Sequence, residues 1–150
     1  MRSTPFLALP ASLALVTGVI GCGDKALTRA EYVKQGDAIC KDFTARQAKL
    51  GKPKTLNDIE RVGDKTKSLA EEQITKLRDL KAPDDIADDA KAYQDLTEKQ
   101  VASIDDLVAA AKVKDVKKIQ SIVTSSAKTE SQSDAKAKAV GFKVCGQNKS

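Results

Sequence analysis

Hydrophobic positions recur at alternating intervals of three and four from residue 28 onward, which is the spacing of amphipathic helices. The third of four such stretches is the clearest, and its predicted inward positions are Ile86, Ala90, Tyr93, Thr97, Gln100, Ile104, Leu107 and Ala111. The fourth has as its predicted inward positions Val116, Ile119, Val123, Ser126, Ser133, Ala137, Val140 and Val144. Its middle, Thr124 to Asp134, is rich in Ser, Thr and Lys, which leaves open a bend, fraying or a break into two helices.

Residues that start or end helices separate these stretches. Thr28 followed by Glu31 matches a capping box, in which each side chain satisfies a free backbone amide at the start of a helix. Pro83 ends the second stretch, because proline cannot continue a helix. The expected boundaries are Thr28 and Gly51 for the first helix, Thr55 and Pro83 for the second, Asp84 and Lys114 for the third, and Val116 and Val144 for the fourth.

Four amphipathic segments with short connections favour an all-α fold, an antiparallel four-helix bundle over residues 28–150. The sequence contains no alternating strand pattern and no glycine-rich phosphate loop. Aromatic residues make up 3% of the chain and Trp is absent, so the core must be built from Leu, Ile, Val and Ala. In an up-and-down bundle the first and last helices are neighbours.

The chain before residue 28 has the order of a secretory signal peptide: Arg2, an apolar run from Phe6 to Ile20, and the small residue Gly21. The run of about 15 residues is shorter than the roughly 20 that cross a bilayer. Val19-Ile20-Gly21-Cys22 resembles the lipobox of bacterial lipoproteins, in which the cysteine receives a diacylglyceryl group and becomes the first residue after cleavage.

This resemblance implies a lipoprotein signal peptide over residues 1–21, lipidation and palmitoylation of Cys22, and a polar tether over residues 22–27. The membrane is then a partner of the chain through its lipidated cysteine, and the protein lies on the extracytoplasmic face of the cell membrane. Two acyl chains on one residue suffice for stable attachment. A secreted protein cleaved near Gly21 and an uncleaved membrane anchor are the alternatives.

With Cys22 assigned to lipid, Cys40 and Cys145 remain as a pair, either as a disulfide or as two buried free thiols. Cys40 lies about 18 Å along the first helix from Thr28, whereas the end of the fourth helix belongs beside Thr28. Bridged cysteines require Cα atoms within about 7 Å. A break in the Ser-rich stretch, or a non-helical tail from Gly141 folding back along the first helix, would reconcile the two.

Three short segments carry a resemblance to a known group: Ala30-Glu31-Tyr32-Val33, Asp37-Ala38-Ile39-Cys40 and Gly141-Phe142-Lys143-Val144-Cys145-Gly146. They resemble motifs of small exported actinobacterial lipoproteins of unknown function. The resemblance implies a helical fold and pairing of Cys40 with Cys145, and it implies no activity.

The sequence offers little for catalysis. Asp84-Asp85-Ile86-Ala87-Asp88-Asp89 contains the aspartate pattern that holds magnesium in prenyl-diphosphate synthases, but Asp105-Asp106 does not supply their second motif. Capping of the third helix is the favoured role of these acids, ahead of weak Ca²⁺ binding. The chain contains no histidine, the commonest general base. We therefore expect no catalytic residue, no metal site and no cofactor.

Charge is distributed unevenly. Basic and acidic side chains number 8 and 4 in residues 22–54, 8 and 14 in residues 55–111, and 9 and 3 in residues 112–150. The first and fourth helices should therefore share a basic face that contacts anionic lipid or wall polymer. The candidate contact residues are Lys34, Lys41, Arg46, Lys49, Lys117, Lys118, Lys136 and Lys138. Ordinary solvated helix faces are the competing interpretation. Nucleic-acid binding is not expected in an exported chain so poor in aromatic residues.

The function predicted from the sequence is that of a cell-envelope lipoprotein, a non-enzymatic binding or adaptor module whose protein partner is unknown. The alternative is a carrier of a small apolar or lipid ligand between the helices. A cavity lined by Leu, Ile and Val would favour the carrier, whereas tight packing of small residues would favour the adaptor.

Overall fold

The computed structural model describes residues 27–147, most of which lie in four α-helices. The helices are α1 (Arg29–Ala48), α2 (Leu56–Asp79), α3 (Ala87–Lys112) and α4 (Val116–Val140), and a 3₁₀ turn, η1 (Asp84–Ile86), precedes α3. The predicted signal peptide, Cys22 and all of the tether except Leu27 lie outside the described residues.

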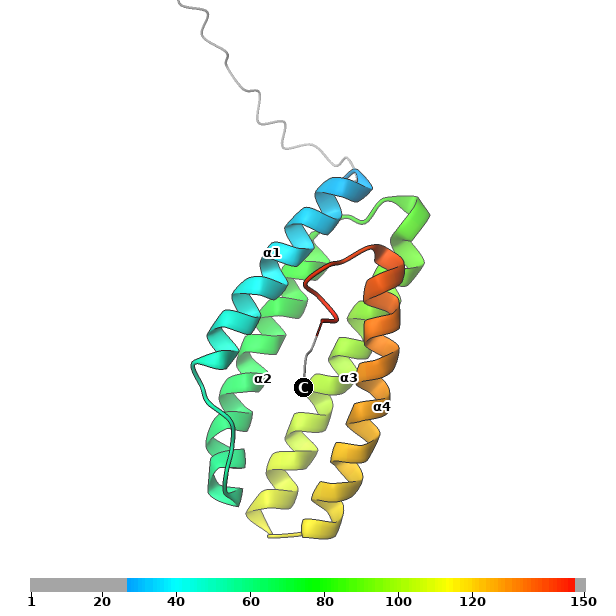
Figure 1. Ribbon diagram of the computed structural model, residues 1–150. Helices are drawn as coiled ribbons and strands as arrows, with labels where there is room; N and C mark the ends of the chain where they lie inside the picture. The colour runs from blue at the N-terminus through cyan, green and yellow to red at the C-terminus, as the bar shows by residue number, and fades with distance from the viewer. Residues whose placement is uncertain (1–26, 148–150) are drawn as a thin grey trace, which may run out of the picture.

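The helices pack in chain order, α1 on α2, α2 on α3 and α3 on α4, and Figure 1 shows them running up and down. This confirms the predicted all-α, antiparallel four-helix bundle. The segment after α4, residues 141–147, turns back and lies between α4 and α1 (Figure 1). The predicted neighbour relation of the first and last helices holds only at one end, where the Arg29 side chain of α1 donates to the Ala139 and Val140 carbonyls of α4. Beyond that point the C-terminal segment lies between the two helices.

Local capping explains where three helices begin. The Thr28 side chain accepts a hydrogen bond from the Glu31 N–H, and the Glu31 carboxylate accepts one from the Thr28 N–H at 2.9 Å. Thr55 forms the same capping box at the start of α2, and the Asp115 carboxylate accepts a hydrogen bond from the Lys118 N–H at the start of α4. These contacts satisfy amides that have no partner within the helix.

The start of the third helix differs from the prediction. Asp84 was expected to cap it, but residues Asp84–Ile86 form a 3₁₀ turn and neither η1 nor α3 has a side-chain cap hydrogen bond. Ile86 is buried in the core at this point. We attribute the separate turn to this burial, since a tighter turn before α3 lets Ile86 point inward.

The fourth helix is continuous from Val116 to Val140, so the Ser-rich stretch does not break it. Hydroxyl groups there donate to carbonyls in the preceding turn, as Thr124 does to Gln120, which satisfies them without opening the helix. Three of the predicted inward positions are wrong. Val123 is exposed and its neighbour Ile122 is buried instead. Val116 and Val144 are exposed as well.

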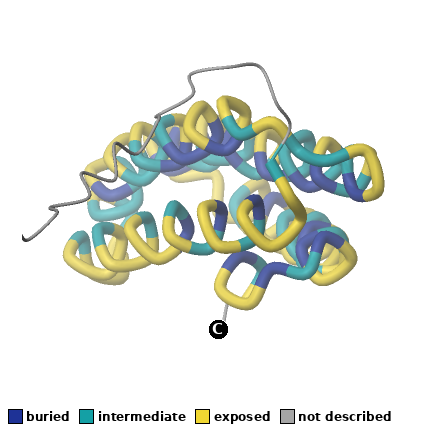
Figure 2. The backbone as a smooth tube through the Cα atoms, turned by 90° about the horizontal axis from the view of Figure 1, so that it is seen from above, coloured by how far each residue is buried: buried dark blue, intermediate teal, exposed yellow. Residues whose placement is uncertain are grey.

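The main core lies near the end of the bundle where α1 begins. It combines all four α-helices, η1 and the C-terminal segment, and its buried members are Tyr32, Cys40, Leu77, Ile86, Ala90, Tyr93, Ala137, Val140, Phe142 and Cys145. A second, smaller cluster contains Ala70, Ile74 and Val101. Figure 2 shows the buried residues on the inward sides of the helices and within the C-terminal segment.

Candidate functional site

The C-terminal segment is held by a disulfide between Cys40 and Cys145, whose Cα atoms lie 5.3 Å apart. This confirms the pairing and excludes the alternative of two free thiols. Of the two arrangements that could bring these cysteines together, the structure adopts the second, a non-helical tail that leaves α4 at Gly141. Gly141 has a φ of 102°, a left-handed conformation that favours glycine at the end of a helix.

Hydrogen bonds and ring contacts supplement the disulfide. The Asp37 carboxylate accepts hydrogen bonds from the backbone N–H groups of Lys143, Val144 and Cys145 at 2.8–3.2 Å. The Phe142 ring lies between two tyrosines, with ring-centre distances of 5.8 Å to Tyr32 and 5.6 Å to Tyr93. The segment thus occupies the space where a pocket between α1 and α4 would otherwise open.

Polar groups in the described core all have partners. Gln73 donates from Nε2 to the Cys40 sulfur at 3.2 Å, and no buried side-chain nitrogen or oxygen of the described residues lacks a hydrogen bond. Burial raises the pKa of Tyr93 to about 12, so its hydroxyl stays protonated near neutral pH. No described polar side chain in the core is left to bind a ligand.

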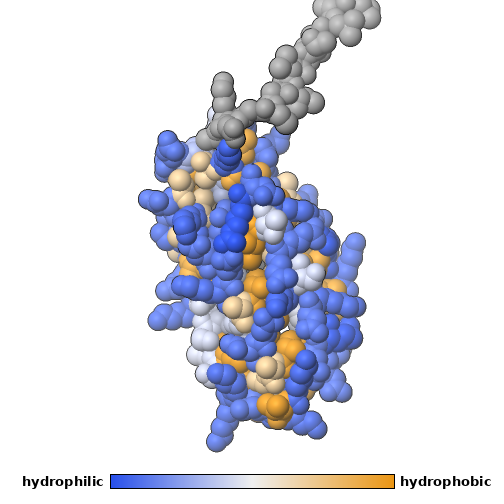
Figure 3. Space-filling view, turned by 180° about the vertical axis from the view of Figure 1, so that it is seen from behind, coloured by the Kyte–Doolittle hydropathy of each residue, from blue (hydrophilic) through white to orange (hydrophobic). Residues whose placement is uncertain are grey.

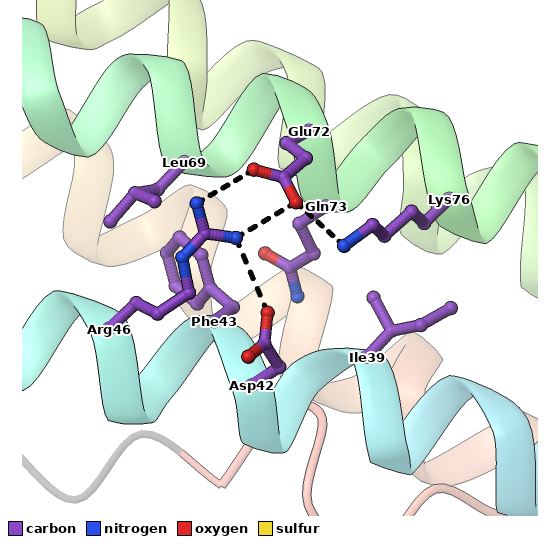
Figure 4. Close-up of a pocket in the computed structure, with 8 residues that line it drawn as sticks. All are labelled: Ile39, Asp42, Phe43, Arg46, Leu69, Glu72, Gln73 and Lys76. Carbon is purple, nitrogen blue, oxygen red and sulfur yellow. Dashed lines mark hydrogen bonds and ion pairs between the residues drawn. The ribbon is translucent and has the colours of Figure 1, made fainter.

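A shallow pocket lies between α1 and α2 (Figure 4). Arg46 crosses it, donating to Asp42 at 3.3 Å and to Glu72 at 2.8 Å, while Lys76 donates to the same Glu72 carboxylate at 2.6 Å. Hydrogen bonds from Arg46 and then Lys76 lower the pKa of Glu72 to about 2. The pocket has a volume of about 10 Å³, which is room for about one water molecule.

The aspartates at the start of α3 make contacts within the protein. Asp89 accepts a hydrogen bond from Lys136 at 2.7 Å, and Asp85 lies 3.6 Å from Arg29. Asp88 and Asp89 fall in the first turn of α3, where negative charge complements the helix dipole. Over residues 27–147, no group of three or more acidic, Cys or His side chains is arranged to hold a metal ion.

The predicted basic residues do not all remain available for an anionic surface. Arg46 and Lys136 are paired with carboxylates. The others are exposed: Lys34, Lys41 and Lys49 in or just after α1, and Lys117, Lys118 and Lys138 on α4. α1 packs on α2 and α4 packs on α3, and the C-terminal segment lies between α1 and the end of α4 (Figure 1), so the bundle does not join the two groups through an extended α1–α4 interface.

The structure draws attention to a surface that sequence reasoning did not single out. Residues 112–118, the turn between α3 and α4, carry four exposed lysines and two exposed valines. The lysines are visible as a charge run in the sequence. The valines are not recognisable there, since Val116 was assigned to the core by its spacing.

Comparison with protein-family models, curated proteins and solved structures found no match to this chain. The resemblance to exported lipoproteins therefore stays a prediction from its motifs. Across the described part of the chain, no helix is both long enough and apolar enough to cross a membrane.

Proposed function

We propose that this protein is a lipid-anchored, non-enzymatic binding module of the cell envelope that acts through its outer surface. The observation that supports surface action best is the filled interior. The pocket between α1 and α2 has room for about one water molecule, and the C-terminal segment occupies the space between α1 and α4. The lipobox-like segment ending at Cys22 supports the anchor.

The outer surface is the part of the molecule that a partner would meet. Seen from behind, it consists mainly of hydrophilic side chains, with hydrophobic side chains in a narrow line between them (Figure 3). The partner that fits such a surface is a protein or an anionic component of the envelope, such as lipid or wall polymer. Crosslinking in intact cells followed by purification would identify it.

The carrier alternative has a direct test. The purified protein would be extracted with organic solvent and the extract examined by mass spectrometry. We expect no apolar molecule in an amount comparable with that of the protein, because the pocket between α1 and α2 has room for about one water molecule. A co-purified lipid at near one-to-one ratio would favour the carrier.

The anchor is tested by Cys22→Ala, which removes the thiol that would receive the lipid. We expect the variant to accumulate as an uncleaved precursor or to leave the membrane for the medium, while the unaltered protein enters the detergent phase on phase partitioning. Ala26→Ser, in the predicted tether, is the control and should partition as the unaltered protein does. A Cys22→Ala variant of mature mass in the detergent phase would contradict the lipobox prediction.

A further inference from the structure

Exposed apolar side chains gather at the end of the bundle that carries the α3–α4 turn. Four large hydrophobic residues are exposed among those the structure describes. Three of them are Val113, Val116 and Val123, whose exposed fractions are 74%, 54% and 56%. Val116 and Val123 lie seven residues apart and so on one side of α4. Since α3 has 26 residues, this end lies about 39 Å along the bundle from the start of α3.

Lysines without carboxylate partners surround these valines. Lys112, Lys114, Lys117 and Lys118 are all exposed, and none of the four forms an ion pair in the described structure, whereas Lys67, Lys76, Lys91 and Lys136 each do. The one acid of the turn, Asp115, caps α4. Residues 112–118, which we name the distal tip, therefore combine unpaired positive charge with exposed apolar surface.

The backbone holds the distal tip in one conformation at the expense of local stability. The Lys114 N–H donates to the Ala111 carbonyl and the Asp115 N–H to the Ala110 carbonyl, which is the Schellman arrangement at a helix end. Glycine is usual at the left-handed position of this motif, but here it is Lys114, with a φ of 57°.

A second unfavourable feature lies in the first turn of α4. Lys117 and Lys118 occupy it and no acidic residue does, although the positive end of the helix dipole disfavours cations there. At positions 114 and 117, glycine and glutamate would suit the fold better. Both lysines instead add positive charge to the tip.

We propose that the distal tip docks on an anionic lipid bilayer, with its lysines on the head groups and Val113 and Val116 at the boundary of the acyl chains. The proposal rests on the envelope location proposed above. Because the six residues of the tether span at most about 20 Å, the anchored bundle then lies along the bilayer, with the start of α1 and the tip both at its surface. A bilayer matches both halves of the patch, because it offers negative charge and an apolar phase together. A wall polymer would leave the valines in water. A second copy of the chain could offer its own tip valines, but it would bring the four exposed lysines of each tip against one another, and like charges across an interface are unfavourable.

The position of the tip permits a test that does not depend on the anchor. The tip and the start of α1 lie at opposite ends of the bundle (Figure 1), and the whole described fold lies after residue 26. A chain of residues 23–150 therefore retains the bundle and its disulfide without Cys22. Docking is measured by sedimentation of this chain with two kinds of vesicle. One consists of phosphatidylcholine alone, and the other also contains about 30% phosphatidylglycerol, an anionic lipid.

We expect binding to the anionic vesicles that weakens as added salt shortens the Debye length below about 10 Å. Lys117→Glu should weaken this binding by about fivefold or more. Lys99→Glu, with the same change in net charge at an exposed position on α3, is the matched control and should leave it nearly unchanged. Val113→Ser should weaken binding several-fold without changing its dependence on salt, because it removes apolar contact alone.

One variant separates docking from folding. Lys114→Gly should raise the melting temperature by about 3–6 °C, because glycine relieves the left-handed strain, and should still weaken vesicle binding by about fivefold. Equal binding to both kinds of vesicle, no binding at low salt, equal losses with Lys99→Glu and Lys117→Glu, or no effect of Val113→Ser would each overturn the proposal. Binding of the tip to a soluble anionic polymer as tight as to vesicles would overturn it in favour of that polymer.

The outcome is separate from that of the anchor test. Detergent partitioning of the full chain with no vesicle binding by residues 23–150 would overturn the tip proposal and leave the anchor intact. Vesicle binding by residues 23–150 with failed partitioning of the full chain would support the tip and contradict the anchor.

Discussion

Gly36 marks the closest approach of the C-terminal segment to a helix. A Cβ atom at this position would overlap with Cε1 of the Phe142 ring, and both residues are buried. A glycine within a helix lowers helix stability relative to alanine by about 0.5–1 kcal/mol. Here its lack of a side chain lets the Phe142 ring rest directly on α1.

Gly36→Ala should therefore destabilise the protein, although the same change at an open helix position would stabilise it. We expect a loss of about 1–3 kcal/mol in the free energy of unfolding, typical of overpacking a core, measured by urea denaturation. Gln35→Ala, at the exposed neighbouring position, should change it by less than about 0.5 kcal/mol. The double variant Gly36→Ala with Phe142→Leu should lose less free energy of unfolding than the two single variants lose in sum. A stabilising Gly36→Ala would show that Phe142 does not occupy this place.

At the scale of single elements, α1 is attached to α2 by charged contacts as well as by apolar ones. Arg46 of α1 and Lys76 of α2 both donate to Glu72 (Figure 4). Ile39 and Phe43 line the same pocket. Because the pKa of Glu72 is lowered to about 2 in the folded state, its charge favours folding at pH values above the ordinary pKa of a glutamate, and this contribution disappears as the pH falls toward 2.

Glu72→Gln should accordingly be less stable than the unaltered protein near neutral pH, and the difference should shrink as the pH falls from about 4.5 to about 2. Thermal unfolding across this range measures it. Glu71→Gln is the control, because Glu71 has one longer ion pair, 3.8 Å to Lys67, and its effect at neutral pH should be smaller. If the melting temperature of Glu72→Gln stays below that of the unaltered protein by the same amount from pH 7 to pH 2, the role assigned to the Glu72 charge is contradicted.

At the scale of the whole molecule, the Cys40–Cys145 disulfide joins residues 105 positions apart. It links α1 to the segment that follows α4, so the two ends of the described chain are tied across the gap between the outer helices (Figure 1). A closed loop of this length removes much of the conformational freedom of the unfolded chain, which in the chain-entropy model stabilises the fold by up to about 4.7 kcal/mol.

Cys145→Ser in a chain of residues 23–150 should lower the free energy of unfolding by about 2–5 kcal/mol, which appears as a lower melting temperature. Reduction of the unaltered chain should have a similar effect, whereas Ser131→Ala, an exposed change on α4, should have little. Intact mass should lie about 2 Da below the fully reduced value, as expected for one disulfide. Two thiols that react with an alkylating agent in the native chain would contradict the bridge.

Features that depend on neighbouring residues could be predicted from the sequence. The capping box at Thr28 and the start of the second helix at Thr55 are confirmed, because the capping partners lie within three residues of one another. The helical class and the number of helices are confirmed for the same reason, since apolar spacing acts within each segment. The lipobox-like segment, the charge run of residues 112–118 and the cysteine count can also be recognised from the sequence alone.

Contacts between distant segments decided the rest. The choice of Ile122 over Val123 for the core depends on how α4 is rotated against α3, which spacing in a polar stretch does not determine. The tail from Gly141 lies between α1 and α4 because Phe142 fits over Gly36 and because the Asp37 carboxylate accepts hydrogen bonds from backbone N–H groups of the tail. The exposed valines of the distal tip, which carry the proposed docking surface, follow from the same packing. Sequence determined the helices through local physics, and only tertiary packing decided which faces were buried and which surface was left for a partner.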